Sequence, residues 1–509
     1  MSKQKDSYVL GSDLGTSGCK TIVLDADGRI CGRAFREYPT SRPRPGWAEQ
    51  HPNDWFDAFC VTARKAIDQA GIHPKTIAAV SIVGITHNVV LLDERDEVLR
   101  PSIIYTDTRS LEQNKALQEQ WGEQVFRRTW NQLSPIWTWP QLLWLREQEP
   151  HIWERVRKIL FPKDYVRYRL VPMFVTDKID PIGTLLYDPI DGQWIEEFCN
   201  SLGLPAKAFP QSVSPLQVVG KVSKSSAEAT GLYPGTPVIA GTTDTAAEVF
   251  GTGALTPGQT IIKLATVGRI AAVSQNPLDH PTALNYPHVL PGLWYPGTCT
   301  KFAASAFSWA RQVFWDHDGN HYDYKLMNQA VETVPPGAEG LLFHPYLAGE
   351  FAPSWDPHLR ASFLGVGINH QRAHFTRAVM EGVAFALRDA LMSILELGLC
   401  VDELRLIGGG ATSRIWAQII TDNLGREVLV PEGTDAAYGS ALLAGLAVGM
   451  FDKSPEGIDH LIKIRSRLTP DKRRTILYDE LFSIYKQSAD ATKELSHRLQ
   501  AFQTSYLVE

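Results

Sequence analysis

A short pattern near the start of the chain returns about half a chain later. Residues 13–18 read Asp-Leu-Gly-Thr-Ser-Gly, and residues 263–268 read Lys-Leu-Ala-Thr-Val-Gly, 250 positions further on. In both places a run of strand-forming residues leads into a turn of small residues and then into a second strand. A repeat with a period of half the chain favours two similarly folded lobes facing each other across a cleft. Because the matching stretch is short, a chance similarity is the alternative.

The length of the chain agrees with two lobes. A chain of 509 residues exceeds what a single hydrophobic core usually supports. The content of 44% hydrophobic and 21% charged residues is typical of a globular protein. We therefore expect two domains, residues 1–250 and residues 251–509.

Charge and cysteine content exclude several classes of protein. The net charge is −6 without a Lys/Arg-rich run, so neither nucleic acid nor a membrane surface is an expected partner. No apolar stretch approaches the ~18 residues of a membrane helix, and the first seven residues lack the apolar core of a signal peptide. The six cysteines are scattered without a Cys-x-x-Cys pair, which indicates neither a zinc site nor a disulfide framework. A cytoplasmic location is expected.

Asp244 lies where a predicted strand gives way to a predicted helix. Residues 237–240 form an apolar run, Gly241 and two threonines turn the chain, and residues 245–250 have helical composition. Ligands of open α/β sheets collect at such junctions, where a carboxylate could take the proton of a substrate hydroxyl. On these residues alone, a helix cap is the favoured interpretation, since Asp is a common cap.

Two glycine-containing turns have the chemistry of phosphate or nucleotide binding. Strands are expected at residues 8–13, 21–24 and 30–37, and the turn around Thr16 and Ser17 between the first two leaves amide groups and hydroxyls open, as in an anion-binding nest. An ordinary hairpin turn is the alternative. Three glycines, residues 408–410, separate a predicted strand at 403–407 from a predicted helix at 414–424, so a flat ring or a phosphate could approach the backbone closely.

Polar side chains also follow two other predicted strands. The strand at residues 78–83 leads to Thr86 and His87, and the strand at 102–105 leads to Asp107. His87 and Asp107 could line a pocket, although a structural role for the histidine and for an Asp107–Arg109 pair is the more frequent outcome.

Several helices are expected elsewhere. Residues 53–71 have helical periodicity with Asn53 or Asp54 as the cap, and the small-residue stretch 436–449 predicts a tightly packed helix. The other expected helices cover residues 137–147, 371–397 and 475–500.

These pieces, in this order, resemble the FGGY family of carbohydrate kinases, within the actin/hexokinase/Hsp70-like ATPases, and are most similar to its xylulokinase branch. The most specific stretch is residues 361–366, followed after a seven-residue spacer by residues 374–381, which matches the family's C-terminal signature. Residues 13–18 match its first phosphate motif, residues 408–411 its adenosine motif, and residues 241–244 the stretch that carries its catalytic aspartate.

The resemblance implies an α/β fold of two ribonuclease-H-like domains, with MgATP and the sugar meeting in the cleft between them. It implies that Asp244 is the catalytic base and contacts the sugar, that Asp13 holds Mg²⁺ through water, and that Thr86, His87 and Asp107 bind the sugar. ATP would be bound by these residues: Gly15, Thr16, Ser17, Lys20, Thr266, Gly409, Gly410 and Ala411.

Departures from the family pattern fall mostly on the sugar side. The xylulokinase branch usually has Gln-Met-His where this chain has Ile85-Thr86-His87, and Ala265 and Val267 replace the usual Gly and Ser of the second phosphate motif. The expected function is ATP-dependent phosphorylation of a terminal hydroxyl of a ketopentose, with xylulose, giving xylulose 5-phosphate, as the first candidate. The alternatives are a kinase for another pentulose such as ribulose, a kinase for a small, erythritol-like polyol, and a non-catalytic sugar-binding regulator. A homodimer is the candidate assembly.

Overall fold

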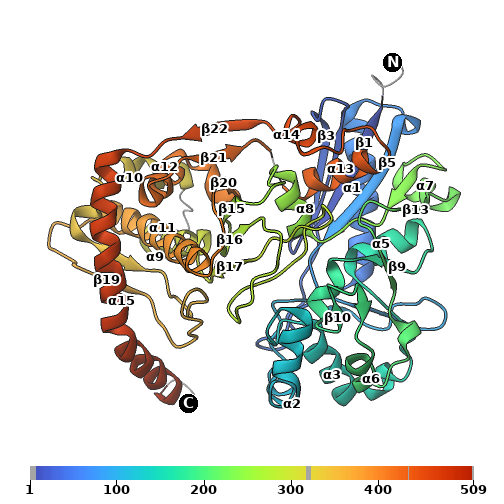
Figure 1. Ribbon diagram of the computed structural model, residues 1–509, viewed down its shortest axis with the longest axis horizontal. Coiled ribbons are helices and arrows are strands. Elements are labelled where there is room, and N and C mark those ends of the chain that lie inside the picture. Colours follow the sequence, from blue (N-terminus) through green and yellow to red (C-terminus); the bar gives the residue numbers. More distant parts are fainter. Residues whose placement is uncertain (1–6, 317–322, 434, 507–509) are drawn as a thin grey trace. The chain divides into compact units, whose positions relative to one another are not determined.

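The chain divides into two compact units in a computed structural model, which describes residues 7–316, 323–433 and 435–506 (Figure 1). Unit 1 comprises Met1–Leu255, Asn285–Trp294 and Gly433–Ile462, and unit 2 comprises Thr256–Leu284, Tyr295–Glu432 and Lys463–Glu509. Along the chain, unit 1 first gives way to unit 2 after Leu255, close to the boundary expected at 250/251. Residues 285–294 and 433–462 belong to unit 1 again, so a single boundary does not describe the division.

Unit 1 is built on a six-stranded mixed sheet. Strands β3, β2 and β1 are antiparallel neighbours, β1 pairs in parallel with β5, β5 pairs in parallel with β14, and antiparallel β13 forms the edge. In sheet order the strands are β13 (Val218–Lys221), β14 (Pro237–Ile239), β5 (Ile77–Gly84), β1 (Tyr8–Leu14), β2 (Gly18–Leu24) and β3 (Ile30–Glu37).

Unit 2 is built on a sheet with the same arrangement. Its strands, in sheet order, are β17 (Gly297–Thr300), β16 (Gly268–Ala272), β15 (Gln259–Leu264), β20 (Glu403–Ile407), β21 (Val428–Pro431) and β22 (Ile464–Leu468). Again three antiparallel strands are followed by two parallel pairings and an antiparallel edge. The repeated stretches 13–18 and 263–268 therefore lie at equivalent hairpins, β1–β2 and β15–β16. Two similarly folded α/β lobes are confirmed.

Helices cover both faces of the unit 1 sheet. Helix α1 (Pro52–Ala70) packs on β2 and β3, and its Phe59 and Ala63 share a buried core with Leu10 and Leu14 of β1. The side chains of a strand alternate between faces, so Gly11 faces the opposite side. There helix α13 (Ala436–Ala447) packs on β1 and β5.

Glycine permits a very close approach of α13. A Cβ atom on Gly11 would lie 2.7 Å from the Cα atom of Ala441, and one on Gly439 would lie 2.5 Å from the carbonyl carbon of Ala247 in helix α8 (Asp244–Gly251). The prediction that residues 436–449 form a tightly packed helix is confirmed.

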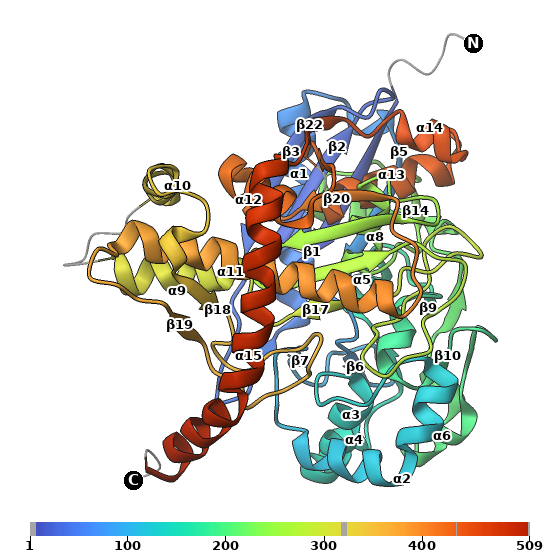
Figure 2. The same ribbon diagram turned by 60° about the vertical axis from the view of Figure 1, so that its left-hand side comes forward.

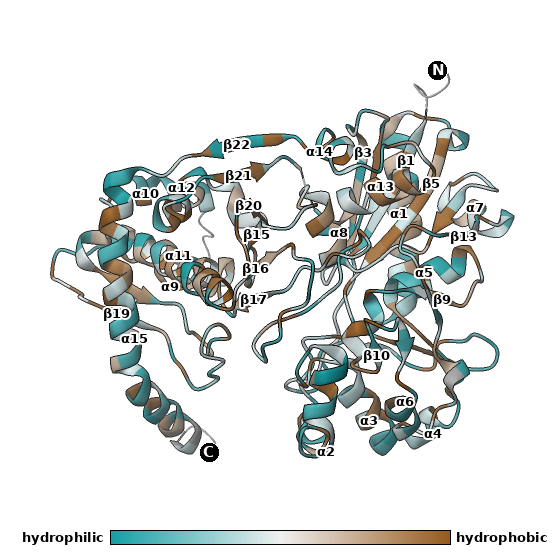
Figure 3. Cartoon of the chain, in the orientation of Figure 1, coloured by the Kyte–Doolittle hydropathy of each residue, from teal (hydrophilic) through white to brown (hydrophobic). Residues whose placement is uncertain are grey.

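The core of unit 2 lies between its sheet and helices α9 (Ala304–Phe314), α11 (Arg372–Glu396), α12 (Arg414–Leu424) and α15 (Lys472–Tyr506). Figure 2 shows α15 passing across α11, where the ring of Phe385 lies 5.4 Å from that of Tyr485. Central strands such as β5 are hydrophobic along their length, whereas much of α15 is hydrophilic (Figure 3). Within the described ranges, no helix has the length and apolarity needed to cross a membrane.

The remaining part of unit 1 is an insertion between β5 and β13. Its main helices are α2 (Leu111–Thr129), α3 (Thr138–Gln148), α5 (Pro162–Leu170) and α6 (Glu196–Ser201), together with a 3₁₀ turn at Asp180–Thr184, whereas α7 (Lys224–Thr230) follows β13. One sequence-based detail is wrong: α1 is capped by His51, whose side chain accepts a hydrogen bond from the amide of Asn53, rather than by Asn53 or Asp54. Pro52 at the first helical position favours this start one residue earlier.

Candidate active site

Three parallel strands of unit 1, β1, β5 and β14, end at one edge of its sheet. Asp13 lies near the end of β1, and His87 and Asp244 follow β5 and β14. The amide of Ile85, just beyond β5, donates to the carbonyl of Leu14 at the end of β1 (3.0 Å), and Gly84 bridges to Thr243, just beyond β14. Burial raises the pKa of the nearby Tyr38, and the charges of Asp13 and Asp244 raise it further. The edge therefore collects two carboxylates, as expected for a ligand site of an open α/β sheet.

Asp244 is the first residue of α8 and is not its cap. The cap is Thr243, whose hydroxyl accepts a hydrogen bond from the amide of Ala246 at 3.1 Å. Asp244 accepts from the amide of Thr245 through Oδ1 (2.6 Å). A carboxylate in the first turn is favoured by the helix dipole, which stabilises its ionised form. Capping therefore does not account for the aspartate.

The turn between β1 and β2 presents hydrogen-bond donors. Its three carbonyl groups are already occupied: Tyr38 donates to Gly15 through its hydroxyl and to Ser17 through its amide, and the Gln50 side chain donates to Thr16. The amides of Thr16 and Ser17 and the exposed Ser17 side chain can therefore donate hydrogen bonds to a ligand. Convergent amides of this kind suit an anion.

Lys20, the fourth predicted ligand from this hairpin, lies in an ion pair. Its ammonium group contacts Asp435, the cap of α13, whose other oxygen accepts from the amide of Tyr438 at 3.0 Å. Both ion-pair side chains are about one-third exposed. A phosphate near Lys20 would therefore compete with Asp435.

His87 lies beyond β5 among aromatic rings. Its imidazole is 4.7 Å from the ring of Trp137 and 6.3 Å from that of Tyr105, and Trp137 is 6.5 Å from Tyr286. Burial lowers the pKa of His87 to about 3, which keeps the ring neutral at physiological pH. Among the residues with described positions, none bonds its buried Nδ1 atom. Thr86 is half-buried.

The same aromatic group connects the predicted sugar and phosphate residues. The hydroxyl of Tyr105 lies 3.1 Å from that of Thr16, so the phosphate-type turn and the aromatic group around His87 are neighbours within unit 1. Rings suit the apolar faces of a sugar, and hydroxyls suit its oxygens.

Sequence reasoning missed the aromatic residues of this pocket. Trp137 was expected only at the start of a helix, and Tyr286 was expected in the second domain. Tyr286 is brought to unit 1 by its neighbour Asn285, whose amide donates to the side chain of Asn131 (2.9 Å) while its carbonyl accepts from it (3.0 Å). The residues next to Asn131 and Asn285 contain no pattern that predicts this pairing.

Asp107 is held by its own neighbours. Its carboxylate forms a two-pronged pair with Arg109 (2.9 and 2.7 Å), and one oxygen also accepts from the amide of Ala48 (2.5 Å). The Arg109 guanidinium stacks 3.7 Å from the ring of Trp47. With Asp107 only 1% exposed, this arrangement fits the structural alternative weighed above, and a direct sugar contact stays a prediction.

The equivalent turn in unit 2 is built in the same way. Thr266 is exposed after β15, and its carbonyl accepts from the amide of Ala303 (3.1 Å) and from the Ser305 hydroxyl (2.6 Å). The carbonyl of Ala265 accepts from the amide of Ala304 (2.7 Å), at the start of α9. This turn too has its carbonyls occupied, and the Thr266 side chain lies in the open.

The three glycines after β20 are not all explained by packing. Gly408 has a φ of +91°, and a Cβ there would lie 2.6 Å from the Leu264 carbonyl oxygen, while one on Gly410 would lie 2.6 Å from Cδ2 of Leu264. A Cβ on Gly409 would meet no atom within 4 Å among the described residues. Close packing therefore requires glycine at positions 408 and 410 but not at position 409, which is exposed. The next residue, Ala411, is buried.

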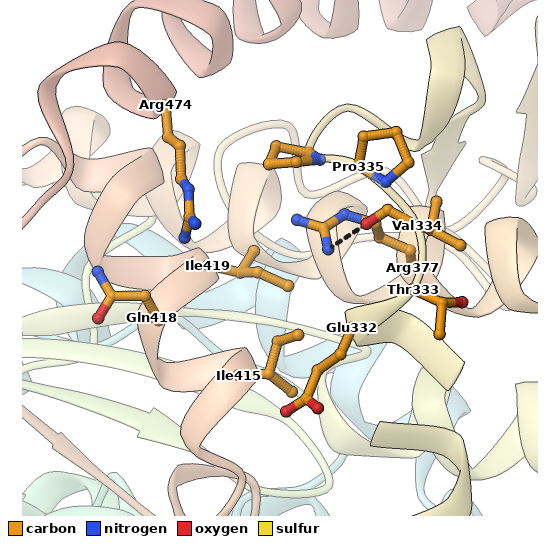
Figure 4. Close-up of a pocket in the computed structure, with 10 residues that line it drawn as sticks. Glu332, Thr333, Val334, Pro335, Arg377, Ile415, Gln418, Ile419 and Arg474 are labelled. Atoms are coloured by element: carbon orange, nitrogen blue, oxygen red, sulfur yellow. Dashed lines mark hydrogen bonds between the residues drawn. The ribbon is translucent and has the colours of Figure 1, made fainter. Parts of the chain in front are cut away.

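A pocket of about 420 Å³ lies beside α12, the helix that follows these glycines (Figure 4). Three residues of α12 line it, together with residues 332–336 that end helix α10 (Tyr324–Glu332) and lead on from it. In Figure 4 the Arg377 guanidinium is bonded to the Val334 carbonyl (3.0 Å). None of the predicted site residues lines this pocket.

The donor set for a cation is small. Within the described part of the chain, no group of three or more His, Cys, Asp or Glu side chains could hold a metal ion. One or two carboxylates such as Asp13 and Asp244 suit Mg²⁺, which keeps several waters and usually completes its shell with substrate phosphates.

Comparisons with known proteins cover nearly the whole chain. Residues 8–251 match the model of the FGGY family of carbohydrate kinases, N-terminal domain, and residues 265–448 match the model of its C-terminal domain. A xylulose kinase of Bacillus subtilis is 32% identical over 97% of this chain and 99% of its own length, and a gluconokinase of the same organism is 28% identical over 94% and 95%. A solved xylulose kinase from Rhodospirillum rubrum superimposes with a TM-score of 0.87 at 27% identity, over 96% of this chain and 100% of that one.

Proposed function

The chain belongs to the FGGY family of carbohydrate kinases and is an ATP-dependent sugar kinase, and we propose that it phosphorylates a terminal hydroxyl of a ketopentose, with xylulose as the first candidate and xylulose 5-phosphate as the product. The observation that carries the proposal is the common edge of β1, β5 and β14, which collects Asp13, His87 and Asp244. Phosphoryl transfer needs a positioned hydroxyl, a proton acceptor and donors around the moving phosphate.

We assign the proton acceptor to Asp244. Its carboxylate begins α8, where the helix dipole favours the ionised form that a base requires. His87 would hold the sugar through its Nδ1, which has no hydrogen-bond partner among the described residues and can accept from a hydroxyl. Asp13 would hold Mg²⁺ through water, and the ion neutralises phosphate charge when it is bound.

We assign ATP to the two hairpin turns and the glycine turn. Gly15, Thr16 and Ser17 in unit 1 and Thr266 in unit 2 would hold phosphates, and Gly409, Gly410 and Ala411 would face the adenosine. The occupied carbonyls of both hairpin turns support this assignment, because a turn that offers its amides and hydroxyls favours an anion. Lys20 would bind phosphate only by leaving Asp435.

Replacing Gly409 by Ala tests the adenosine assignment. The new methyl group enters open space at a backbone angle that Ala adopts, so the free energy of unfolding should change little. If the nucleotide lies against this backbone, KM for ATP should rise about tenfold, the worth of roughly 1.4 kcal/mol, with KM for the sugar unchanged. Initial rates with varied ATP measure this.

Gly410→Ala is the contrasting variant, because its methyl group collides with Leu264. It should lower the melting temperature, whereas Gly409→Ala should not. An unchanged KM for ATP in the stable Gly409→Ala protein would place the nucleotide away from this turn.

A coupled ADP-release assay over a panel of pentuloses, small polyols and gluconate tests the substrate. The proposal expects the highest kcat/KM with D-xylulose, as the similarity to xylulose kinases supports. A clear preference for ribulose, a polyol or gluconate would replace the ketopentose assigned here. If the protein bound a sugar but released ADP with no member of the panel, it would be a non-catalytic sugar-binding regulator.

Thr86 is the position where we expect selectivity to be tuned. Its side chain is half-buried beside His87, and it is short where the xylulokinase branch has Met. Thr86→Met should move the kcat/KM ranking towards D-xylulose by about 1–3 kcal/mol, because it fills volume and removes a hydroxyl that can pair with substrate. The panel assay measures the ranking. A lower melting temperature with the ranking unchanged would mean that Thr86 only packs.

A homodimer and a cytoplasmic location remain proposals. Sedimentation equilibrium of the purified protein would decide the first, and fractionation of the source cells the second.

A further inference from the structure

His87 has a backbone conformation that needs support. Its φ is +49°, in the left-handed region that residues other than glycine rarely adopt and that costs free energy unless neighbours impose it. Two polar groups fix its peptide groups: the carboxylate of Asp180 accepts from the His87 amide (3.1 Å), and the Thr138 hydroxyl donates to the His87 carbonyl. Gly183, three residues after Asp180, makes room, because a Cβ there would lie 2.8 Å from the His87 ring.

Asp180 belongs to a buried ionic cluster. Lys163 lies 2.8 Å from Asp164 and 3.6 Å from Asp180, and Arg167 lies 3.4 Å from Asp164. Asp177 holds the start of the turn by accepting from the amides of Ile179 (2.9 Å) and Asp180 (2.8 Å). The charged side chains of this cluster are at most 1% exposed. Such a cluster resists displacement, because any shift would leave a buried charge without its partner.

The cluster holds three carboxyl groups, on Asp164, Asp177 and Asp180, against the two cations Lys163 and Arg167. Burial raises the pKa of Asp180 well above its usual range, with Lys163 opposing the shift, and burial also raises the pKa of Asp177. A neutral side chain with an acceptor oxygen should therefore replace Asp180 at little cost.

We propose that Asp180 is a positioning residue of the sugar site: from this cluster it holds the His87 backbone so that the imidazole faces the substrate. The inference rests on the proposed sugar contact of His87. It assigns a role to the 180–184 turn, which lies about 90 residues further along the chain than the histidine. A misplacement of about 1 Å at such a residue can cost about 10²-fold in rate.

Three variants test the proposal. Asp180→Leu removes the acceptor and should lower kcat/KM for the best sugar about 10²-fold, with KM for ATP within about twofold of wild type. Asp180→Asn keeps an acceptor oxygen and should retain activity to within about tenfold. Gly183→Ala pushes on the His87 ring without touching the cluster, so it should also lower kcat/KM for the sugar, even if Asp180→Leu does not fold.

Asp188→Leu is the matched control. Asp188 is another buried aspartate of unit 1 that accepts two backbone amides, those of Ile190 (3.0 Å) and Asp191 (3.1 Å). It should lower the melting temperature and leave the sugar KM unchanged.

A double-mutant cycle with His87→Ala decides whether Asp180 acts through the histidine. If it does, Asp180→Leu should lower sugar kcat/KM by less than about threefold in the His87→Ala background. A full loss in that background, or an unchanged sugar kcat/KM in Asp180→Leu and Gly183→Ala, would overturn the inference. The proposed function fails separately, on the wild-type protein, if it phosphorylates no sugar of the panel.

Discussion

Replacing Asp244 by Asn should lower kcat by about 10²–10⁴ with the best sugar and leave sugar binding and the melting temperature nearly unchanged. An amide has the shape of the carboxylate but cannot accept the hydroxyl proton, and a positioned base contributes about this much. The amide oxygen can still accept from the amide of Thr245. Steady-state kinetics, sugar titration and thermal unfolding of the two proteins measure the three quantities.

Thr243→Ala separates catalysis from capping. Because Thr243 carries the cap of α8, its removal should cost about 1 kcal/mol of unfolding free energy while the carboxylate remains. Its kcat should fall far less than that of Asp244→Asn. Near-normal turnover in Asp244→Asn, with an equal loss of stability in both variants, would reduce Asp244 to a structural part of the helix start.

Replacing His87 by Ala should lower kcat/KM by about 10³-fold for every sugar in the panel. The change removes a buried, neutral imidazole whose Nδ1 has no partner within the described residues, and it opens a gap beside Trp137. Losing a hydrogen bond and a packed ring together is worth roughly 4 kcal/mol. Because the change lies in the proposed sugar site, KM for ATP should stay within about twofold.

Trp137→Phe is a milder variant of the same pocket. It keeps an apolar ring near His87 and should lower sugar kcat/KM by about tenfold at most. If His87→Ala raised KM for ATP as much as KM for the sugar, the histidine would support the fold of unit 1 and not the sugar.

Local chemistry made much of the fold predictable. Strand β3 and helix α12 have the bounds expected from sequence, 30–37 and 414–424, because turn residues border them at Asp25–Gly28 and Gly408–Gly410. The position of Asp244 after β14 followed from the same kind of signal, an apolar run ended by glycine. Such features depend on neighbours in sequence, so the sequence carries them.

Long-range pairing was not predictable. Small residues at 436–449 indicated close packing, but nothing in that stretch identified Gly11 as the surface it packs on. The aromatic wall of the His87 pocket depends on the Asn131–Asn285 bonds, which join residues 154 positions apart. The Asp107–Arg109 pair was anticipated from sequence, yet the hydrogen bond from the amide of Ala48, 59 positions away, is a property of the folded chain.

The return of residues 433–462 to unit 1 has a consequence for synthesis on the ribosome. Strands β1 and β5 emerge early, but α13, which covers one of their faces, begins at residue 436, about 180 residues after the first part of unit 1 ends at Leu255. At translation rates of about 5–20 residues per second, that face of the sheet stays uncovered for roughly 10–40 s until α13 has been synthesised. The nascent chain thus carries an unfinished apolar sheet for about a third of its elongation, and chaperones that bind such surfaces have their longest opportunity during this interval.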